Sequence, residues 1–402
     1  MRPFKSTIPI EEARELLRSG VTPVARTETL PLAQAAGRVA AAQVAASIFV
    51  PPFSRSAMDG YAVVAEDTRG ASRERPVRLR IVERVYTGNT PAHVVAPGCC
   101  AEIATGAPLP DGADAVVMVE ETLRLDDDHV AIWSEAHPKQ NIGRKGADIS
   151  PGDLVVRPGE LLTPSRLGAM AAVGAAQVEV YARPRVAILS TGNEVIEPGE
   201  PLEPGQIYDV NRYTLAAVAE AHGCVAELLP PARDTLASLH AALDACADAD
   251  VIIFSGGSSV GDRDLLIDLI AERGDVVFHG IAVRPGKPTM FARVGGRPFF
   301  GMPGNPTSCL SNAYILLVPF LRATARLPVF APRTVSATLG KTIVSPANRH
   351  QFYTVRLDGR VALPAFKGSG DITSLSNADG YIEIPASEHT VAEGATVTVT
   401  LF

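Results

Sequence analysis

RVAILSTGNE (Arg185–Glu194) and VIIFSGGSSVGDRD (Val251–Asp264) are the two stretches that decide the fold. Each begins with an apolar run, which is typical of a strand buried on both faces of a parallel sheet, and each ends in small polar residues. Further patterns alternate with them along the chain: helices at Asn211–His222, Leu236–Cys246 and Asp264–Arg273, and strands at Val225–Leu229 and Val276–His279. This alternation predicts a parallel α/β sheet covered by helices.

The segments on either side of this core have a different pattern. A helix is expected at Ile8–Arg18, which ends before Gly20. Short β-like runs separated by Pro and Gly follow, and Leu154–Val156 is expected to form a hairpin with Leu161-Leu162 around Pro158-Gly159. After Pro328 the chain again shows only short strand patterns, which predict a small β-barrel.

Composition narrows the class of protein. The 402 residues, 46% of them hydrophobic, can bury the cores of about two to four domains. The net charge of −7 and the lack of a Lys/Arg-rich run argue against nucleic-acid binding. No apolar run reaches the roughly 18 residues that a membrane span needs, and the first residues lack the apolar core of a signal peptide. Five cysteines without a CxxC pair fit a protein of the cytoplasm.

The loop Ser255–Asp264 carries the first candidate site. Ligands of parallel sheets bind beyond the carboxyl ends of the strands, and this Gly/Ser-rich loop follows such an end. Glycines let backbone N–H groups approach an anion closely, and the helix that follows offers its positive N-terminus. The loop therefore predicts a phosphate cradle, although a simple turn would have the same composition.

Two rigid loops downstream strengthen the prediction of an anion site. RPGKP places Arg284 and Lys287 three residues apart, and MPGNP places Pro303 and Pro306 before a helix that is expected to start near Thr307. Two cations beside a stiff loop suit a phosphate or an oxyanion, while a solvated surface loop is the alternative.

Several carboxylates stand at loop positions, where they could hold a metal ion. They are Asp59, Asp148, Glu194, Asp234 and Asp264. Each one alone is explained as a helix cap or a turn residue. Together with a phosphate loop they predict Mg²⁺, which prefers oxygen ligands and pairs with substrate phosphates.

Six of these loops resemble one family. They are SAMDGYAV (Ser56–Val63), TGAPLP (Thr105–Pro110), ILSTGNE (Ile188–Glu194), SGGSSVGDRD (Ser255–Asp264), RPGKPT (Arg284–Thr289) and GMPGNPTS (Gly301–Ser308). In this order they are similar to the motifs of molybdopterin molybdenumtransferase, the MoeA family, to which the C-terminal domain of gephyrin also belongs. The resemblance extends over essentially the whole chain.

The resemblance implies a multidomain fold and a homodimer. Residues 1–50 and 143–182 would form a discontinuous elongated domain for dimerisation, into which a β-rich domain of residues 51–142 is inserted. Residues 183–327 would form a MogA-like three-layer α/β domain that binds molybdopterin, and residues 328–402 the C-terminal β-barrel. The active site would lie between the α/β domain of one subunit and the inserted domain of the other.

The resemblance also implies an activity: insertion of molybdate into adenylylated molybdopterin, with Mg²⁺-dependent release of AMP. An adenylyltransferase that supplies the pterin nucleotide and maturation proteins for molybdenum enzymes would be its partners. The implied catalytic residues are Asp59, Asp148, Asp234, Asp264 and Lys287. The implied substrate-binding residues are Thr105, Glu194, Gly256, Gly257, Ser259, Arg284, Pro303, Pro306, Ser369 and Ser374. The implied metal ligands are Glu194, Asp234 and Asp264.

This sequence departs from the family pattern at four positions. Asn193 stands where the family often has Asp, and Gly280 where many members have Lys. Arg284 replaces a common Lys, and a bidentate guanidinium differs from a point charge. Ser258 replaces a common Val. Without the Lys that many family members have at position 280, the site has one positive charge fewer to attract molybdate.

Two other functions compete with this interpretation. An adenylyltransferase that activates molybdopterin with ATP would use a similar α/β domain, but SAMDGYAV, TGAPLP and a C-terminal barrel are absent from stand-alone members of that class. A scaffold without catalysis would dimerise and bind partners, but it would have no need of charged residues such as Asp59, Glu194 and Lys287 at these loops.

Overall fold

The computed structural model describes residues 7–256, 265–345 and 348–402, which divide into two compact units. Unit 1 comprises Met1–Glu28, Gly37–Val39 and Glu179–Phe402. Unit 2 comprises Thr29–Ala36 and Ala40–Val178. Among the described residues, no helix is both long and apolar enough to cross a membrane.

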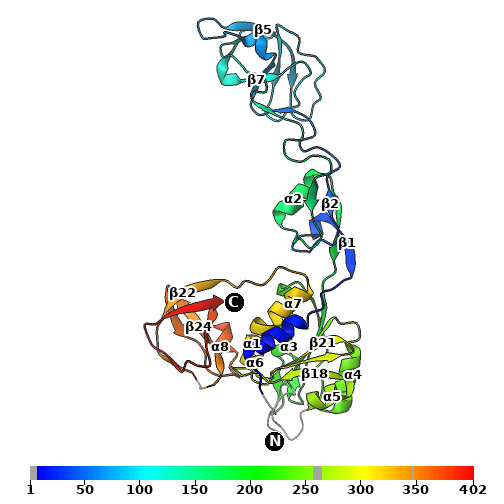
Figure 1. Ribbon diagram of the computed structural model, residues 1–402, viewed down its shortest axis with the longest axis vertical. Coiled ribbons are helices and arrows are strands. Elements are labelled where there is room, and N and C mark those ends of the chain that lie inside the picture. Colours follow the sequence, from blue (N-terminus) through cyan, green and yellow to red (C-terminus); the bar gives the residue numbers. More distant parts are fainter. Residues whose placement is uncertain (1–6, 257–264, 346–347) are drawn as a thin grey trace. The chain divides into compact units, whose positions relative to one another are not determined.

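A six-stranded sheet forms the centre of unit 1 (Figure 1). Its strand order is β16 (Val225–Leu228), β13 (Arg185–Ser190), β17 (Val251–Ser255), β21 (Arg297–Met302), β20 (Met290–Val294) and β18 (Gly274–His279). The first four strands are parallel, and β20 runs antiparallel to both of its neighbours. The predicted parallel sheet is therefore confirmed. The hairpin β20–β21 was not predicted, although the turn at Gly295 and Gly296, both with positive φ, is a hairpin signal.

Alternating side chains of the central strands explain why helices cover both faces. In β13, Val186 and Ile188 join one apolar cluster, whereas Ala187 and Leu189 join another. Helices α4 (Leu236–Ala245) and α5 (Leu265–Arg273) contribute to the second cluster. Helices α1 (Ile10–Ser19), α3 (Asn211–Ala221), α6 (Pro306–Asn312) and α7 (Val318–Thr324), with a π-helical turn at Ala313–Leu317, contribute to the first. The result is a three-layer α/β domain (Figure 1).

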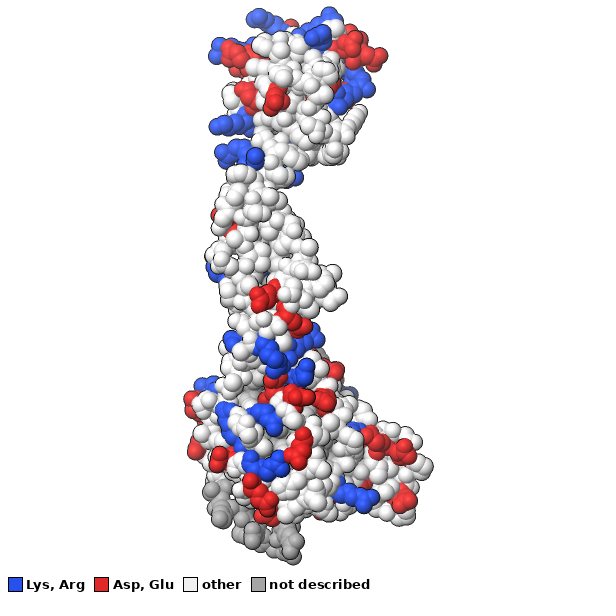
Figure 2. All heavy atoms as spheres, turned by 90° about the vertical axis from the view of Figure 1, so that its right-hand side faces the viewer, with Lys and Arg blue, Asp and Glu red and all other residues white. Residues whose placement is uncertain are grey.

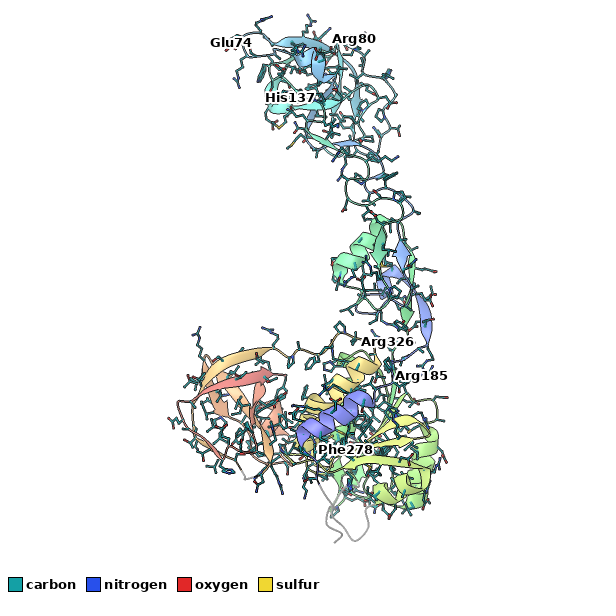
Figure 3. All side chains as sticks on the ribbon, viewed as in Figure 1. Glu74, Arg80, His137, Arg185, Phe278 and Arg326 are labelled. Atoms are coloured by element: carbon teal, nitrogen blue, oxygen red, sulfur yellow. The ribbon has the colours of Figure 1, made fainter. Side chains whose placement is uncertain are left out.

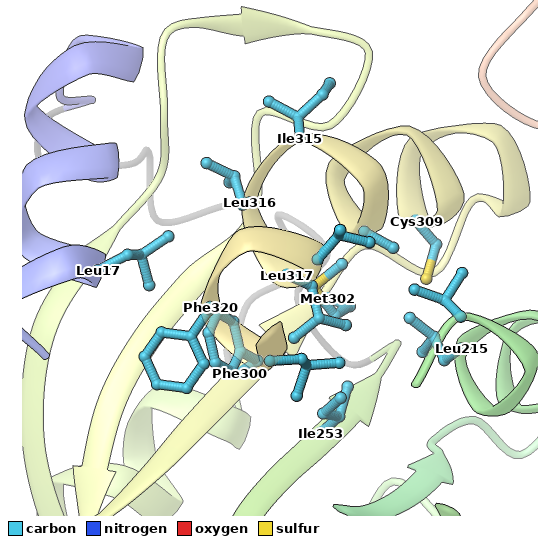
Figure 4. Packing of buried hydrophobic residues seen from close by; sticks show 14 of the residues in the cluster. Leu17, Leu215, Ile253, Phe300, Met302, Cys309, Ile315, Leu316, Leu317 and Phe320 are labelled. Atoms are coloured by element: carbon cyan, nitrogen blue, oxygen red, sulfur yellow. The ribbon is translucent and has the colours of Figure 1, made fainter. Parts of the chain in front are cut away.

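Aromatic side chains fill the larger of these clusters. Phe320 of α7 makes edge contacts with Phe300 of β21 and Phe291 of β20, with ring centroids 5.0 and 5.6 Å apart. Leu17 of α1 and Leu316 of the π-helical turn lie beside them (Figure 4). Phe278 of β18, labelled in Figure 3, belongs to the same cluster. The first helix of the chain is thus part of a core built mainly by residues after 185.

The C-terminal region of unit 1 forms the predicted barrel. Its strands are β22 (Thr334–Leu339), β28 (Thr396–Leu401), β26 (Gly380–Ile384), β24 (His350–Asp358) and β25 (Val361–Pro364). The ring of five closes because β25 pairs with β22 as well as with β24. Strand β19 (Val283–Arg284) joins β24 from outside the ring, which connects the RPGKP loop to the barrel.

A second six-stranded sheet forms most of unit 2. Its order is β7 (Ala115–Met118), β4 (Gly60–Val63), β6 (Cys99–Ile103), β5 (Val77–Val85), β9 (His129–Ile132) and β8 (Thr122–Arg124). The sheet has an apolar cluster on each face, because Tyr61 and Val63 of β4 belong to one cluster and Ala62 to the other. The β-rich character of this segment is confirmed, while strand β6 was not predicted.

The rest of unit 2 joins segments that lie far apart in the sequence. Strand β11 (Leu154–Val156) pairs with β2 (Val44–Ala45), so the predicted hairpin with Leu161-Leu162 is wrong. The reason is that the turn residues Gly159 and Glu160 form backbone hydrogen bonds with Ala40. Similarly, β3 (Arg55–Ser56) pairs with β10 (Ile142–Gly143). Strand β1 (Thr27–Pro31) pairs with β12 (Gln177–Tyr181), and each of these two strands has residues in both units. On the face shown in Figure 2, the part around β2 and α2 (Pro164–Ala172) carries few charged side chains.

Candidate functional site

Three parallel strands of unit 1 end at one edge of the sheet. Ser190 of β13 lies opposite Ser255 of β17, which lies opposite Met302 of β21. The motifs STGNE, SGG and MPGNP therefore leave the sheet side by side. The sequence prediction that these loops meet at the carboxyl ends of the strands is consistent with this register.

Gly256 lies where two of these loops cross. Its backbone has φ +101°, and its N–H donates to the carbonyl of Met302 at 3.1 Å. A Cβ atom at this position would stand 2.3 Å from the carbonyl oxygen of Thr191. Only glycine fits here, because both the backbone angle and the close approach exclude a side chain. Gly257, Ser259 and Asp264, also expected in the site, lie outside the described residues.

Two carboxylates follow this edge from neighbouring loops. Glu194 is exposed, and Asp234 is half-buried after Arg233. Burial raises the pKa of Asp234, and the negative charge of Glu194 raises it further. The Oδ1 atom of Asp234 is buried without a hydrogen-bond partner among the described residues. An oxygen in that position suits a cation as its partner.

Asn193, one of the departures from the family pattern, connects these two loops. Its Oδ1 accepts a hydrogen bond from the backbone N–H of Asp234 at 3.2 Å. A carboxylate oxygen could accept the same bond. The change from Asp to Asn therefore removes a charge beside Glu194 and Asp234 and keeps the contact that holds the loop of Asp234 in place.

The RPGKP loop is fixed by hydrogen bonds that its backbone carbonyls accept. Gly286 has φ +99°, and its carbonyl accepts hydrogen bonds from Asn312 Nδ2 at 2.8 Å and Thr289 Oγ1 at 3.0 Å. The Lys287 carbonyl accepts two backbone N–H groups, and its side chain is half-buried. Arg284 is exposed and lies in register with Gln351 of the barrel strand β24. The two cations thus differ in burial and in the elements that hold them.

The MPGNP loop contacts the barrel loop of residues 367–374. Thr307 N–H donates to the Ser369 carbonyl at 3.1 Å, and Asn305 Nδ2 donates to Ser369 Oγ at 3.3 Å. The hydroxyl of Ser374 is fully buried and accepts the backbone N–H of Lys367 at 2.9 Å. The structure therefore places Ser369 beside Asn305, between Pro303 and Pro306, whereas Ser374 supports the barrel loop from within.

A buried polar network supports the edge, and sequence reasoning missed it. Asp209 is 4% exposed, and its Oδ1 accepts the hydroxyl of Ser190 at 2.7 Å and the backbone N–H of Arg212 at 3.1 Å. Arg212 in turn pairs with Asp209 and with Glu197. The signal was present in the sequence as YDVNR, a set of polar residues at the start of an otherwise apolar helix.

In unit 2 the SAMDGYAV and TGAPLP motifs form one cluster. Ser56 exchanges backbone hydrogen bonds with Ala107 and Gly106, and Asp59 Oδ1 accepts the backbone N–H of Thr105 at 2.7 Å. This bond lowers the pKa of the exposed Asp59 carboxyl, so it stays ionised at neutral pH. Asp148 is also exposed, and its backbone N–H donates to the carbonyl of Val50 at 3.0 Å.

No cluster of three His, Cys, Asp or Glu side chains suited to a metal ion exists within residues 7–256, 265–345 and 348–402. Glu194 and Asp234 are a pair, and the third expected ligand, Asp264, is outside these ranges. Chemically, the edge of the sheet in unit 1 offers a crossing of glycine backbones and a carboxylate pair. Such a set suits a phosphorylated ligand with a divalent cation.

Three family models match the chain in order. The MoeA N-terminal region (domains I and II) matches residues 8–174, a probable molybdopterin binding domain matches residues 187–323, and the MoeA C-terminal region (domain IV) matches residues 336–402. The chain is thus similar to this family over nearly all of its length.

Individual relatives agree with the models. Molybdopterin molybdenumtransferase 2 of Mycobacterium tuberculosis H37Rv is 39% identical over 385 residues, which cover 93% of this chain and 95% of that protein. The molybdopterin molybdenumtransferase of Haemophilus influenzae is 33% identical, with 98% of both chains covered. The crystal structure of a molybdopterin biosynthesis MoeA protein from Pyrococcus horikosii has 41% identity and a TM-score of 0.86, and covers 98% of this chain and 99% of that one.

Proposed function

The chain belongs to the MoeA family, and on that premise we propose that it transfers molybdenum to adenylylated molybdopterin in molybdenum cofactor synthesis. The observation that carries the proposal for this chain's own residues is the carboxylate pair Glu194 and Asp234 beside the glycine crossing at Gly256. This arrangement suits a phosphate-linked substrate and a cation at the strand ends.

The proposed reaction has two parts. Hydrolysis of the phosphoanhydride bond between the pterin phosphate and the adenylate releases AMP. The two dithiolene sulfurs bind molybdenum, and one oxygen of molybdate leaves as water with the two thiol protons. Because the substrate supplies the sulfur ligands, the protein does not need a cysteine cluster, and all five of its cysteines are free and buried. Such reduced thiols support a cytoplasmic location.

The chain's own residues bind and orient the reactants. The backbone around Gly256 and the rigid loop of Pro303 and Pro306 hold the phosphate-bearing substrate, because N–H groups and fixed loops suit an anion. Lys287 and Arg284 attract the molybdate dianion. In unit 2, Asp59 is held by the N–H of Thr105 as a preformed carboxylate. Asp59 and Asp148 are assigned to the same reaction through the family resemblance.

Mg²⁺ fits the residues at the strand ends. The unpartnered, buried Oδ1 of Asp234 and the adjacent Glu194 carboxylate form a pair of hard oxygen donors. Mg²⁺ commonly takes one or two carboxylates and completes its shell with water and substrate phosphates, so a pair is sufficient. When bound, the ion neutralises charge on the anhydride oxygens.

A homodimer is part of the proposal. Four large apolar side chains lie exposed between Glu194 and the first turn of α3: Leu202 (50% exposed), Ile207 (56%), Tyr208 (39%) and Tyr213 (43%). Ile207 N–H donates to the carbonyl of Glu194 at 2.8 Å, so this segment is connected directly to the candidate site. Exposed apolar side chains of this kind favour burial against another protein, and a second copy of the chain would place them in a subunit interface.

The dimer is tested by light scattering coupled to size-exclusion chromatography. The wild-type chain should elute with the mass of two chains. Ile207→Glu should shift the mass toward one chain, because an ionised side chain opposes burial. Val329→Glu is the matched control, since Val329 is 95% exposed in unit 1 and lies far along the chain from this segment. A wild-type mass of one chain at all concentrations would contradict the dimer.

The activity is tested by AMP release from purified adenylylated molybdopterin. With Mg²⁺ and molybdate, the wild-type chain should release AMP and retain molybdenum in the product, and it should consume no ATP. Lys287→Ala should raise the molybdate concentration needed for half-maximal rate. ATP consumption with molybdopterin would indicate an adenylyltransferase instead. Tight binding of the nucleotide without release would indicate a scaffold.

A further inference from the structure

Asn211, the first residue of α3, lies in the centre of the loops that leave the sheet. It is 7% exposed, and its side-chain Nδ2 donates to Ser255 Oγ at 2.8 Å and to the Gly304 carbonyl at 2.7 Å. The Pro303 carbonyl lies 3.4 Å from the same nitrogen. One amide group thus connects the end of β17 with the MPGNP loop.

Ser255 completes this connection. Its hydroxyl accepts from Asn211, donates to the Pro303 carbonyl at 3.2 Å and lies 3.7 Å from Cys309 Sγ. Cys309 of α6 and Leu215 of α3 belong to the same apolar cluster and lie near one another in Figure 4. We call Asn211, Ser255 and the carbonyls of Pro303 and Gly304 the amide bracket.

The bracket sits on a rigid base. Asp209 Oδ1 accepts both the Arg212 N–H and the Ser190 hydroxyl, so the start of α3 is tied to the end of β13. Asn211 lies between Asp209 and Arg212 in the sequence and is held with them. Because its backbone is fixed and its surroundings are buried, its amide cannot turn away to find other partners.

The bracket determines the spacing of two loops that were expected to bind substrate. A Cβ on Gly304 would stand 3.4 Å from the Cα of Gly256, and the Gly256 N–H donates to the Met302 carbonyl. The loop of Pro303 and Pro306 therefore packs directly on Gly256. A small outward shift of this loop would widen the space between them.

We propose that Asn211 is a positioning residue that holds the loop of residues 303–306 against Gly256 and so sets the gap in which the phosphate-bearing substrate is bound. The predicted effect of Asn211 on substrate binding rests on the proposed function. Its predicted effect on the position of the loop rests on the amide bracket alone. Asparagine is suited to the place because one NH₂ group supplies two donors, one to the buried Ser255 hydroxyl and one to the Gly304 carbonyl. Aspartate has the same shape without these donors, and leucine has neither donors nor acceptors.

The kinetic experiment compares three variants of the full-length chain with the wild type. Asn211→Asp and Asn211→Leu should raise the KM for adenylylated molybdopterin by about tenfold to 100-fold, because small displacements of a substrate-positioning loop have effects of that size. The concentration dependence on molybdate should stay unchanged. Thr214→Val is the matched control, since Thr214 Oγ1 donates to the Asn211 carbonyl on the same helical turn and is not part of the amide bracket.

A pH series separates positioning from a general loss of structure. As the pH falls, the buried carboxyl that Asn211→Asp introduces takes up a proton and regains one donor. The ratio of the KM of this variant to the wild-type KM should therefore fall toward acid pH. The ratio for Asn211→Leu should stay constant, because leucine cannot regain a donor. A merely destabilised protein would not show this difference between the two variants.

Hydrogen exchange provides a readout that does not depend on activity. Amides of residues 302–309 should exchange faster in both Asn211 variants and in Ser255→Ala, and as in the wild type in Thr214→Val. Unchanged exchange in that segment, or wild-type KM values in both Asn211 variants, would overturn the positioning role. If the wild-type chain releases no AMP, the proposed function fails, and the exchange experiment still decides the role of Asn211.

Discussion

Gly256 shows how strongly a single residue can be constrained at the strand ends. Gly256→Ala should abolish AMP release and lower the free energy of unfolding by about 1–3 kcal/mol, because the methyl group would meet the Thr191 carbonyl and the positive φ would be strained. Chemical denaturation and the AMP assay measure the two effects. Gly205→Ala is the control: its φ is +90° but no atom lies within 4 Å of the added Cβ, so it should show the strain alone and keep activity. If Gly205→Ala lost as much activity and stability as Gly256→Ala, the close contact of Gly256 with the Thr191 carbonyl would not be the cause.

Asp59 tests whether the unit 2 cluster takes part in the reaction. Asp59→Asn should slow AMP release by about 100-fold or more, the lower end of the effect expected for a side chain that acts on the reacting groups. Its midpoint of thermal unfolding should hardly change, because the amide oxygen can still accept the Thr105 N–H and the side chain is exposed. Normal AMP release by a folded Asp59→Asn protein would remove Asp59 from the site.

Asp234 leads to a prediction about pH. Its folded-state pKa is raised, chiefly by burial, so the folded state binds a proton more tightly than the unfolded state does. The wild type therefore loses stability as the pH rises from the ordinary aspartate value through the raised one. Asp234→Asn lacks this loss and should be slightly more stable than wild type at pH 7, by less than about 1 kcal/mol. Thermal unfolding at pH 4 and 7 should show the difference shrinking at pH 4, and added Mg²⁺ should stabilise only the wild type. An Asp234→Asn protein that is less stable than the wild type at pH 7 would contradict this prediction.

Residue-level prediction from sequence was uneven for physical reasons. Gly256 and Asp59 could be proposed as site residues because a glycine or a charged residue within a short loop motif is recognisable from its immediate neighbours in the chain. Asp209 and Asn211 were missed, although both contact residues at the carboxyl ends of the sheet strands in unit 1. Their roles depend on hydrogen bonds to Ser190 and Ser255, and a sequence does not show which polar residues will be buried together.

At the level of elements, packing of the α7 helix against the sheet contributes much of the stability of unit 1. Phe320→Ala should lower the free energy of unfolding by about 3–5 kcal/mol, because Phe320 is 2% exposed and contacts two aromatic rings of the sheet. Val329→Ala, at a side chain 95% exposed, should change it by less than about 0.5 kcal/mol. Denaturant titration of both variants decides this, and a small loss for Phe320→Ala would show that the cluster tolerates a cavity.

Element types were predicted well where the apolar pattern was continuous. In these segments the apolar residues repeat with a single period along the run. Examples are the strands β13 and β17 and the helices α3, α4 and α5. The partner of β11 was predicted wrongly, since the Pro158-Gly159 turn favours a local hairpin while the backbone of residues 159–160 instead pairs with Ala40. Pairing between distant segments is decided by tertiary contacts that local turn chemistry does not contain.

At the level of the whole molecule, unit 2 contains its own cores. The two apolar clusters on the faces of its six-stranded sheet consist of residues between 61 and 142, and that sheet pairs only strands of unit 2. A fragment of residues 40–178 should therefore fold by itself and unfold cooperatively. Dispersed amide signals in an NMR spectrum and a sigmoidal denaturation curve would support this. A fragment without either would show that unit 2 depends on the rest of the chain.

The position of α1 in the core of unit 1 has a consequence for the order of synthesis. Ile10, Ala13 and Leu17 pack among residues that lie between 186 and 381 in the sequence. The ribosome therefore releases this helix long before its partners exist, and a ten-residue helix is unstable alone. At about 5–20 residues per second, its apolar face waits many seconds while unit 2 emerges and folds. During translation α1 is thus made well before the strands it packs against, and it can reach its native place only after they have formed.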